Sequence, residues 1–182
     1  MPVADLPGRC TAGFRVPLFD AGMMLLDAQI GTKAEAITLA ADRLSIAGRT
    51  DNPRELEAAF WLREMAGATG LGGGFAIPHC RSGAVPADSL VIIKPRLPLM
   101  WGPSDDQTVE VIIALVIRET RAASDDITIM AGLARLLMQS DFCQQMKTES
   151  DPQRLAVWLK DKLSGNCRLE NAVNFDLPAS YY

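Results

Sequence analysis

Apolar residues in this chain switch between the spacing of strands and the spacing of helices. The run 24–28 predicts a first strand. Along 32–48 apolar residues recur every three or four positions, and Thr32 stands three residues before Glu35, the spacing of a helix capping box. The segment 53–67 predicts a second helix, because the proline at its start fits a first helical turn. This part of the chain therefore indicates one strand followed by two helices.

The middle of the chain changes to short apolar runs that are typical of buried strands. The glycine-rich stretch 70–74 interrupts the helical pattern and predicts a turn or loop. A short apolar run, 75–77, is halted by Pro78, and the runs 90–93 and 108–117 are rich in β-branched residues. These patterns predict about three strands.

Three further helices are predicted after the strands. Ser124 or Asp125 is expected to cap a helix that continues through Leu137, and Ser140 to cap a shorter one. Asp151 and the proline that follows it open the last helix. Helices on both sides of a run of strands predict a layered α/β domain with a mixed β-sheet.

The domain is expected to span residues 18–165. Residues 1–17 carry three prolines, two glycines and no sustained period, so they are expected to form an N-terminal tail. Residues 166–182 are expected to form a C-terminal tail or linker.

Charge and composition narrow the range of functions. The chain of 182 residues has a formal net charge of −4 and no cluster of Lys or Arg, which argues against nucleic acid and favours a small molecule or a protein as partner. The longest apolar runs are about ten residues, well short of the roughly 20 that cross a bilayer, so no membrane insertion is expected. The four cysteines form no CxxC pair and no secretory pattern precedes them, so a soluble cytoplasmic protein is expected.

The candidate chemistry centres on His79, the only histidine. One histidine cannot supply the multi-histidine ligand sets of most catalytic zinc sites, so no metal is expected. The glycines of 70–74 are followed by no GK[ST] and no helix pattern, so no nucleotide cofactor is expected. Cys80 follows His79, but successive side chains in extended structure point to opposite faces, which argues against a Cys–His pair. A lone histidine without context is most often a residue with no chemical role.

The residues before His79 supply such a context. The segment 63–80 contains an Arg-Glu pair, a Thr-Gly-x-Gly turn and a Gly-aliphatic-Ala-aliphatic-Pro-His run. It resembles the signature of the fructose/mannitol-type EIIA domains of the sugar phosphotransferase system, a group that includes nitrogen-regulatory paralogues. The residues that match the signature in register are Thr69, Gly70, Gly72, Gly74, Ala76, Ile77, Pro78 and His79. The resemblance covers about residues 24–163.

This resemblance implies a phosphotransferase component with a three-layer fold like that of mannitol EIIA. In the family, the Pro-His histidine accepts a phosphoryl group from the phosphocarrier HPr and passes it to a cysteine of an EIIB domain. His79 corresponds to that histidine, and a neutral imidazole nitrogen is a nucleophile at cytoplasmic pH. Arg63 corresponds to the family's arginine, which stabilises the phosphate; the less favoured alternative is a solvated side chain at a helix end.

The glycine-rich turn is the expected phosphate loop. Backbone N–H groups of Gly72, Gly73 and Gly74 are expected to form an anion nest beside Arg63, with Thr69 at the start of the loop. Many family members have asparagine where this chain has Gly73, which removes one side-chain donor.

Two further departures from the family pattern affect the candidate site. Cys80 replaces a glycine or alanine and is interpreted as a small apolar filler. Alignment on Leu133 puts Asp126 where members commonly carry a second histidine, at the start of a helix. A carboxylate there repels a phosphoryl group, although a helix start also favours an acidic residue as a cap.

Three hypotheses follow for the function. The first is a phosphocarrier that serves the uptake of a fructose- or mannitol-like sugar. The second is a nitrogen-type regulatory EIIA whose phosphorylation state controls a protein partner, which the missing second histidine slightly favours. The third is a degenerate domain that no longer accepts phosphate. The sequence leaves the sugar and the oligomeric state open, and an oligomer is compatible with it.

Overall fold

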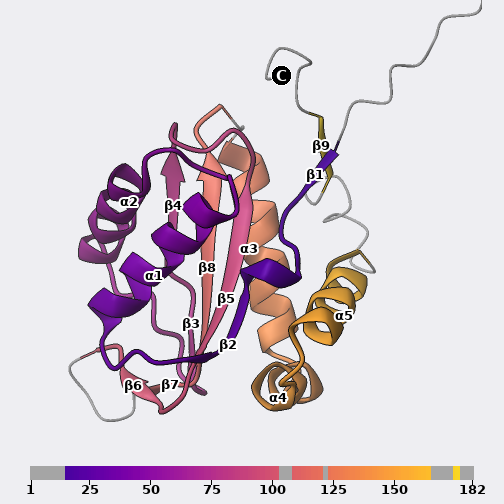
Figure 1. Cartoon of the computed structure of the whole chain (residues 1–182). Helices are drawn as coiled ribbons and strands as arrows, with labels where there is room; N and C mark the ends of the chain where they lie inside the picture. Colours follow the sequence, from indigo (N-terminus) through magenta and orange to yellow (C-terminus); the bar gives the residue numbers. More distant parts are fainter. Residues whose placement is uncertain (1–14, 103–107, 121–122, 165–173, 177–182) are drawn as a thin grey trace, which may run out of the picture.

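The centre of the structure is a mixed β-sheet with helices on both faces (Figure 1). This computed structural model describes residues 15–102, 108–120, 123–164 and 174–176, with their side chains except at 15–16, 123–128 and 174–176. The predicted α/β sandwich of three layers, with a mixed sheet flanked by helices, is therefore confirmed.

Two long buried strands form the middle of the five-stranded sheet. The strands are β2 (Met24–Ala28), β3 (Phe75–Ala76), β4 (His79–Ser82), β5 (Ser89–Pro95) and β8 (Val111–Arg118). β5 and β8 run antiparallel, whereas β2 runs parallel to β5, and β3 and β4 run parallel to β8. Helices cover both faces of β5 and β8, which explains why the sequence of these strands is almost continuously apolar.

Two helices cover the face of the sheet that lies in front in Figure 1, α1 (Lys33–Ile46) and α2 (Pro53–Met65). At the start of α1, the Thr32 hydroxyl accepts a hydrogen bond from the Glu35 amide at 3.2 Å, and the Glu35 carboxylate accepts one from the Thr32 amide at 3.1 Å. The predicted capping box is therefore confirmed. α2 packs against α1 and β4, which places its last turns beside His79.

Three helices follow the sheet, α3 (Ala123–Leu137), α4 (Ser140–Thr148) and α5 (Pro152–Ser164). Figure 1 shows α3 behind the sheet and α5 beside β2. At the start of α5, the Asp151 carboxylate accepts a hydrogen bond from the Arg154 amide at 2.8 Å. Asp151 therefore caps the last helix, as the Asp-Pro pair predicted.

Two predicted helix caps are wrong because the helices begin earlier than expected. α3 begins at Ala123, so Ser124 and Asp125 lie inside its first turn and neither is the cap. Ser140 is the first residue of α4, and Gln139 holds the cap position without a side-chain cap hydrogen bond. A serine or aspartate is favourable within the first turn of a helix as well as at the cap, because the unpaired backbone amides there carry partial positive charge. Residue type alone therefore does not determine where the helix begins.

Several short elements lie outside the main sheet. They are β1 (Arg15–Pro17), the 3₁₀ turn η1 (Ala21–Met23), β6 (Leu99–Met100), β7 (Thr108–Val109) and β9 (Asn174–Asp176). β1 pairs antiparallel with β9, and β6 with β7. The predicted strand 108–117 is divided at Glu110, because the amides of Glu110 and Val111 both donate to the Gly74 carbonyl, at 2.8 and 3.0 Å. The β1–β9 pair joins the two predicted tails and was not predicted from the sequence.

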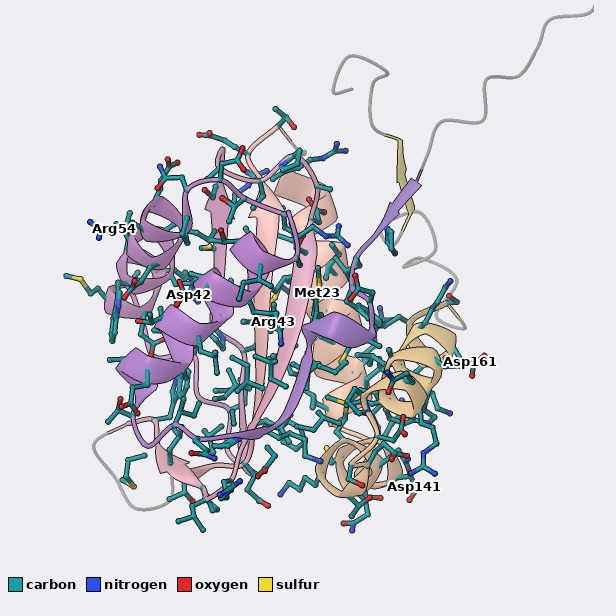
Figure 2. The ribbon with its side chains drawn as sticks, in the orientation of Figure 1. Met23, Asp42, Arg43, Arg54, Asp141 and Asp161 are labelled. Carbon is teal, nitrogen blue, oxygen red and sulfur yellow. The ribbon has the colours of Figure 1, made fainter. Side chains whose placement is uncertain are left out.

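The hydrophobic core lies on both faces of the sheet, and Trp101, Phe60 and Phe142 are its largest fully buried side chains. Met23, labelled in Figure 2, is fully buried where η1 contacts β5 and α5. None of the described helices is long and apolar enough to cross a membrane.

We expect Thr32→Ala to lower the free energy of unfolding by about 1 kcal/mol, because the Glu35 amide loses its acceptor. Urea unfolding followed by tryptophan fluorescence measures this loss. Thr32→Ser keeps the hydroxyl and serves as the control. Equal losses for the two variants would show that the capping hydrogen bond does not stabilise α1.

Candidate functional site

His79 is the first residue of β4 and lies against the middle of β8. β3 and β4 pair with consecutive parts of β8, and Pro78 stands between them. The Pro78 carbonyl accepts a hydrogen bond from the Leu115 amide at 2.9 Å, so the chain stays attached to β8 where proline has no N–H to offer. The sequence predicted His79 after a strand end; the structure instead places it at the start of the next strand, directly opposite Leu115.

The two ring nitrogens of His79 have different partners, and these partners fix the tautomer. Nε2 lies 3.0 Å from Nε of Arg63, and Nδ1 lies 2.8 Å from the carbonyl oxygen of Ile77. A guanidinium can only donate, so Nε2 must accept with its lone pair. Nδ1 then carries the proton and donates to Ile77. The ring is therefore neutral, with Nε2 as the nucleophilic nitrogen.

The surroundings of His79 favour this neutral form. Burial lowers the pKa of His79 below its ordinary value, and the positive charge of Arg63 lowers it further. The hydrogen bond to Ile77 and the negative charge of Glu64 raise the pKa, but the net shift is downward. A nitrogen that stays unprotonated at neutral pH is available for nucleophilic attack.

Arg63 is positioned by the end of α2. Its Nη1 donates to the Gly67 carbonyl at 3.0 Å, just after the helix ends, while its Nε donates to His79. Two directed hydrogen bonds from one planar guanidinium fix its orientation. The structure thus brings together His79 and Arg63, the two residues that the sequence analysis placed first in the site.

Glu64, next to Arg63, anchors this end of α2 through a buried polar network that the sequence analysis missed. Its carboxylate accepts from Lys33 Nζ at 2.8 Å and from the Thr69 hydroxyl, and Trp101 Nε1 donates to the same hydroxyl at 3.2 Å. Burial raises the pKa of Glu64, but the hydrogen bonds from Lys33 and Thr69 outweigh it, and the net pKa is lowered. The carboxylate is therefore charged and paired at neutral pH.

The sequence did contain a signal for this network. Glu64 is the second residue of the Arg-Glu pair, and Trp101 belongs to an aliphatic-x-Trp-Gly turn that also resembles the family. Neither residue type reveals a partner by itself, because the contacts join segments that are more than thirty positions apart in the sequence.

Thr69 has a structural role in this site. It is buried at 4% exposure, and its hydroxyl is engaged by Glu64 and Trp101. The Thr69 side chain is therefore engaged in this network, and its place in a phosphate-binding loop stays a prediction.

The predicted glycine nest is not beside His79. The Ile77 amide donates to the Thr69 carbonyl at 2.9 Å, and the Leu71 amide to the Phe75 carbonyl at 2.8 Å, so the segment doubles back as a hairpin. Gly72, Gly73 and Gly74 form its tip, all with positive φ. Gly74 lies five residues before His79, a span of roughly 16 Å in extended chain.

Contacts at the hairpin tip explain one of these glycines. A Cβ at Gly74 would lie 2.6 Å from Glu110 Oε1 and 2.9 Å from Lys147 Nζ. Gly74 therefore allows a tight turn against the Glu110–Lys147 ion pair, whereas a Cβ at Gly72 or Gly73 would meet open space. That these glycines bind a phosphoryl group stays a prediction.

A cavity of about 780 Å³ opens beside His79. It lies between α2, which contributes Ala59 and Leu62, and α3, which contributes Met130, Ala131 and Ala134. The polar lining residues are Arg63, His79, Cys80 and Arg81. The nucleophilic nitrogen therefore lies in a largely apolar hollow, where an electrostatic interaction is stronger than in water.

Asp126 lies in the first turn of α3, as predicted. Met130 and Ala134 follow it by four and eight positions and line the cavity, so helical spacing puts position 126 on the same side of α3. The Asp126 side chain lies outside the described residues. Its effect on a phosphoryl group stays a prediction.

Cys80 fits the interpretation of a small apolar filler. It is 5% exposed, and burial raises the pKa of its thiol to about 12. A thiol with this pKa stays protonated at neutral pH and is a poor nucleophile. Among the described residues, no group of three or more His, Cys, Asp or Glu side chains could hold a metal ion.

Comparison with known proteins places this site in a family. The sequence model described as "Phosphoenolpyruvate-dependent sugar phosphotransferase system, EIIA 2" matches residues 17–162. The chain belongs to this family. The resemblance drawn from residues 63–80 is thereby confirmed, and the Arg63–His79 pair lies inside the region that EIIA domains share.

Two EIIA-type proteins and one larger relative illustrate the range of this family. The chain is 31% identical over 147 residues to Multiphosphoryl transfer protein 2 of Escherichia coli (strain K12), an alignment that covers 81% of this chain and 17% of that protein. The chain therefore spans less than a fifth of that relative's length. Its fold is similar to the nitrogen regulatory protein IIA-Ntr of Neisseria meningitidis, with a TM-score of 0.69, 24% identity, and coverage of 78% of this chain and 96% of that one.

The third comparison is with one chain of a solved complex. The chain resembles a chain of the complex of mannitol enzyme IIA with phosphorylated enzyme IIB from Escherichia coli, with a TM-score of 0.63 and 21% identity. The match covers 81% of this chain and 97% of that one. Structures at this level of identity establish the EIIA fold, and they leave the particular reaction to the site itself.

We expect His79 to titrate below the ordinary histidine pKa of about 6.5, with the neutral proton on Nδ1. Long-range ¹H–¹⁵N NMR measures both properties, and a single histidine makes the assignment unambiguous. Arg63→Gln should raise the pKa, because it removes a cation that repels the imidazolium. Arg54→Gln, an exposed change at the other end of α2, should leave the pKa unchanged. A neutral form protonated on Nε2 would contradict the assigned tautomer.

Proposed function

We propose that this EIIA-family protein is a cytoplasmic phosphocarrier of a sugar phosphotransferase system. Nε2 of His79 accepts a phosphoryl group from phospho-HPr and passes it to a cysteine of an EIIB domain. The observation that carries this proposal is the neutral His79 ring, which lines the cavity: its Nδ1–H donates to Ile77, and its Nε2 lone pair accepts the hydrogen bond from Arg63.

The transfer step needs a nucleophile and a cation at one point, and the site supplies both. The Nε2 lone pair attacks phosphorus, the new N–P bond forms, and the bond from phosphorus to the donor's imidazole nitrogen breaks with its electron pair left on the donor. Arg63 lies where the phosphoryl oxygens would arrive and can donate to them. In the second step the thiolate of the EIIB cysteine attacks the same phosphorus, and the electron pair of the N–P bond returns to Nε2.

The geometry favours this function for a further reason. Nδ1–H donates to a backbone carbonyl that is fixed by β3 and β4, so the ring does not need to reorient when phosphate arrives. A neutral, oriented ring lowers the reorganisation that the transfer requires. A fructose- or mannitol-like sugar is the expected final acceptor, since this domain's structural relatives include mannitol enzyme IIA.

We expect one added phosphate after incubation with phosphoenolpyruvate, Enzyme I and HPr, measured by intact mass. The phosphate should be acid-labile, as phosphohistidine is, and absent from His79→Ala. An acid-stable phosphate, or one that persists in His79→Ala, would rule out the proposed carrier role for this residue.

The same assay, combined with thermal unfolding, distinguishes a role of Arg63 in phosphoryl transfer from a role in the stability of the fold. A hydrogen bond to a charged group contributes roughly 1.5–3 kcal/mol, so Arg63→Ala should slow transfer by about ten- to a hundredfold. Its thermal unfolding should change little. Normal transfer in a strongly destabilised variant would make Arg63 a packing residue.

A regulatory EIIA is the second candidate function, and Asp126 is the observation that favours it. The resemblance aligns Asp126 with the position where members commonly carry a second histidine, and helical spacing puts position 126 on the same side of α3 as Met130 and Ala134, which line the cavity. If the charge of Asp126 lies about 6 Å from the phosphoryl group, the repulsion at an effective dielectric of 20 is roughly 3 kcal/mol, which is an upper figure because salt screens it. A less stable phosphorylated state would suit a protein that responds to the balance between its two forms.

We expect Asp126→His to be more phosphorylated than the wild type when both are equilibrated with the same phospho-HPr pool. The difference should narrow as salt rises, because the repulsion is screened. Phosphorylated fractions are read from intact mass at low and high salt. Equal fractions at both salt concentrations, with a lower melting temperature for the variant, would make Asp126 a helix-start residue without influence on the site.

A further inference from the structure

The phosphorylated state poses a charge problem that Arg63 alone does not meet. A phosphoryl group carries close to two negative charges and three acceptor oxygens. In the unphosphorylated protein, Arg63 Nε donates to Nε2 itself, and its Nη1 donates to Gly67. Once the Nε2 lone pair forms the N–P bond, this Nε–H must turn to a phosphoryl oxygen. The Arg63 guanidinium, which also donates to the Gly67 carbonyl, is then a single positive charge beside a phosphoryl group with close to two negative charges.

Arg81 is placed to supply a second cation. It lies two residues after His79 in β4, and alternate residues of a strand share one face. The register agrees, because His79 is opposite Leu115 and Arg81 is opposite Ile117, and all four residues line the cavity. Two strand residues separate the Cα atoms of His79 and Arg81 by roughly 6.6 Å, within the reach of an arginine side chain.

We propose that Arg81 binds the phosphoryl oxygens of phospho-His79 from β4, opposite Arg63 on α2. This inference rests on the proposed function, since it concerns the phosphorylated form of the same histidine. The planar guanidinium of arginine suits this role, because its paired N–H groups match two oxygens of a phosphoryl group. The two arginines then approach the group from two different elements of the fold.

Charges around the cavity support this assignment. Among the described side chains that line it, the charged ones are Arg63 from α2 and Arg81 from β4, and there is no acidic residue. The first turn of α3 contributes Asp125 and Asp126, whose side chains lie outside the described residues. The charge of Arg81 on β4 thus adds to that of Arg63 on α2 along the lining of this cavity.

Arg81 is exposed, but it already has an interaction in the unphosphorylated protein. Binding the phosphoryl group is therefore an exchange of partners. The gain is smaller than for a buried pair, because an exposed guanidinium is well solvated before it binds. We expect Arg81 to affect the stability of the phosphorylated form by a modest factor, and to leave the fold unchanged.

The test is ³¹P NMR of the phosphorylated full-length chain, titrated with pH. Nearby cations favour the dianionic phosphoryl group and lower the pKa of its second ionisation. Arg81→Gln should raise this pKa by about 0.5, the size of an exposed ion pair, and lower the equilibrium phosphorylated fraction by about threefold. Arg81→Lys keeps the charge and should fall between wild type and Arg81→Gln.

Arg54→Gln is the matched control, because it removes the same charge from an exposed position near the start of α2, outside the lining of the cavity. Figure 2 shows Arg54 at the outer side of α2, pointing away from the sheet. If Arg81→Gln and Arg54→Gln change the phosphoryl pKa and the phosphorylated fraction equally, the inference is wrong, since only general charge is then involved. If the wild type gains no phosphate on His79, the proposed function fails instead, so the two failures are distinguishable. A thermal melt confirms that each variant is folded.

Discussion

The hydrogen bond from Arg63 Nε to His79 Nε2, 3.0 Å long, is the interaction on which the candidate site depends. It fixes which ring nitrogen keeps its lone pair, because arginine has no acceptor to offer. It also places a permanent cation at the atom where phosphate would bind. The Ile77 carbonyl completes the arrangement from the other side of the ring, so that tautomer, orientation and nucleophile are set together.

This hydrogen bond requires the end of α2 to lie at one position relative to β4. The buried Glu64 network provides that position. Lys33 donates to Glu64 from α1, the Thr69 hydroxyl donates to Glu64 from the segment before β3, and Trp101, which follows β6, donates to that hydroxyl. A buried carboxylate without its hydrogen-bond partners raises the free energy of the folded state. Displacing the end of α2 would separate Glu64 from these partners and is therefore unfavourable. Thr69 and Glu64 thus act on the chemistry indirectly, by holding Arg63 and the strand that leads to His79.

Local signals in the sequence predicted much of this fold, and contacts between distant segments account for what was missed. Thr32 and Asp151 predict helix starts, because each side chain accepts a hydrogen bond from a backbone amide only three residues further along the chain. His79 and Arg63 were found because one motif contains both. The sequence did not predict the hydrogen bond from Trp101 to the Thr69 hydroxyl, because the two residues are thirty-two positions apart. It predicted a turn at the glycines of 72–74 but not where the tip of that turn lies relative to His79, because residue type alone does not determine this.

The central claim is that Nε2 of His79, and not Nδ1, carries the phosphoryl group. The most direct measurement is the ¹⁵N–³¹P coupling in ¹⁵N-labelled protein phosphorylated through HPr. The Arg63 and Ile77 hydrogen bonds predict the one-bond coupling on Nε2, with Nδ1 still protonated. A one-bond coupling on Nδ1 would contradict the account, because the Ile77 hydrogen bond would then have to break for the reaction to occur.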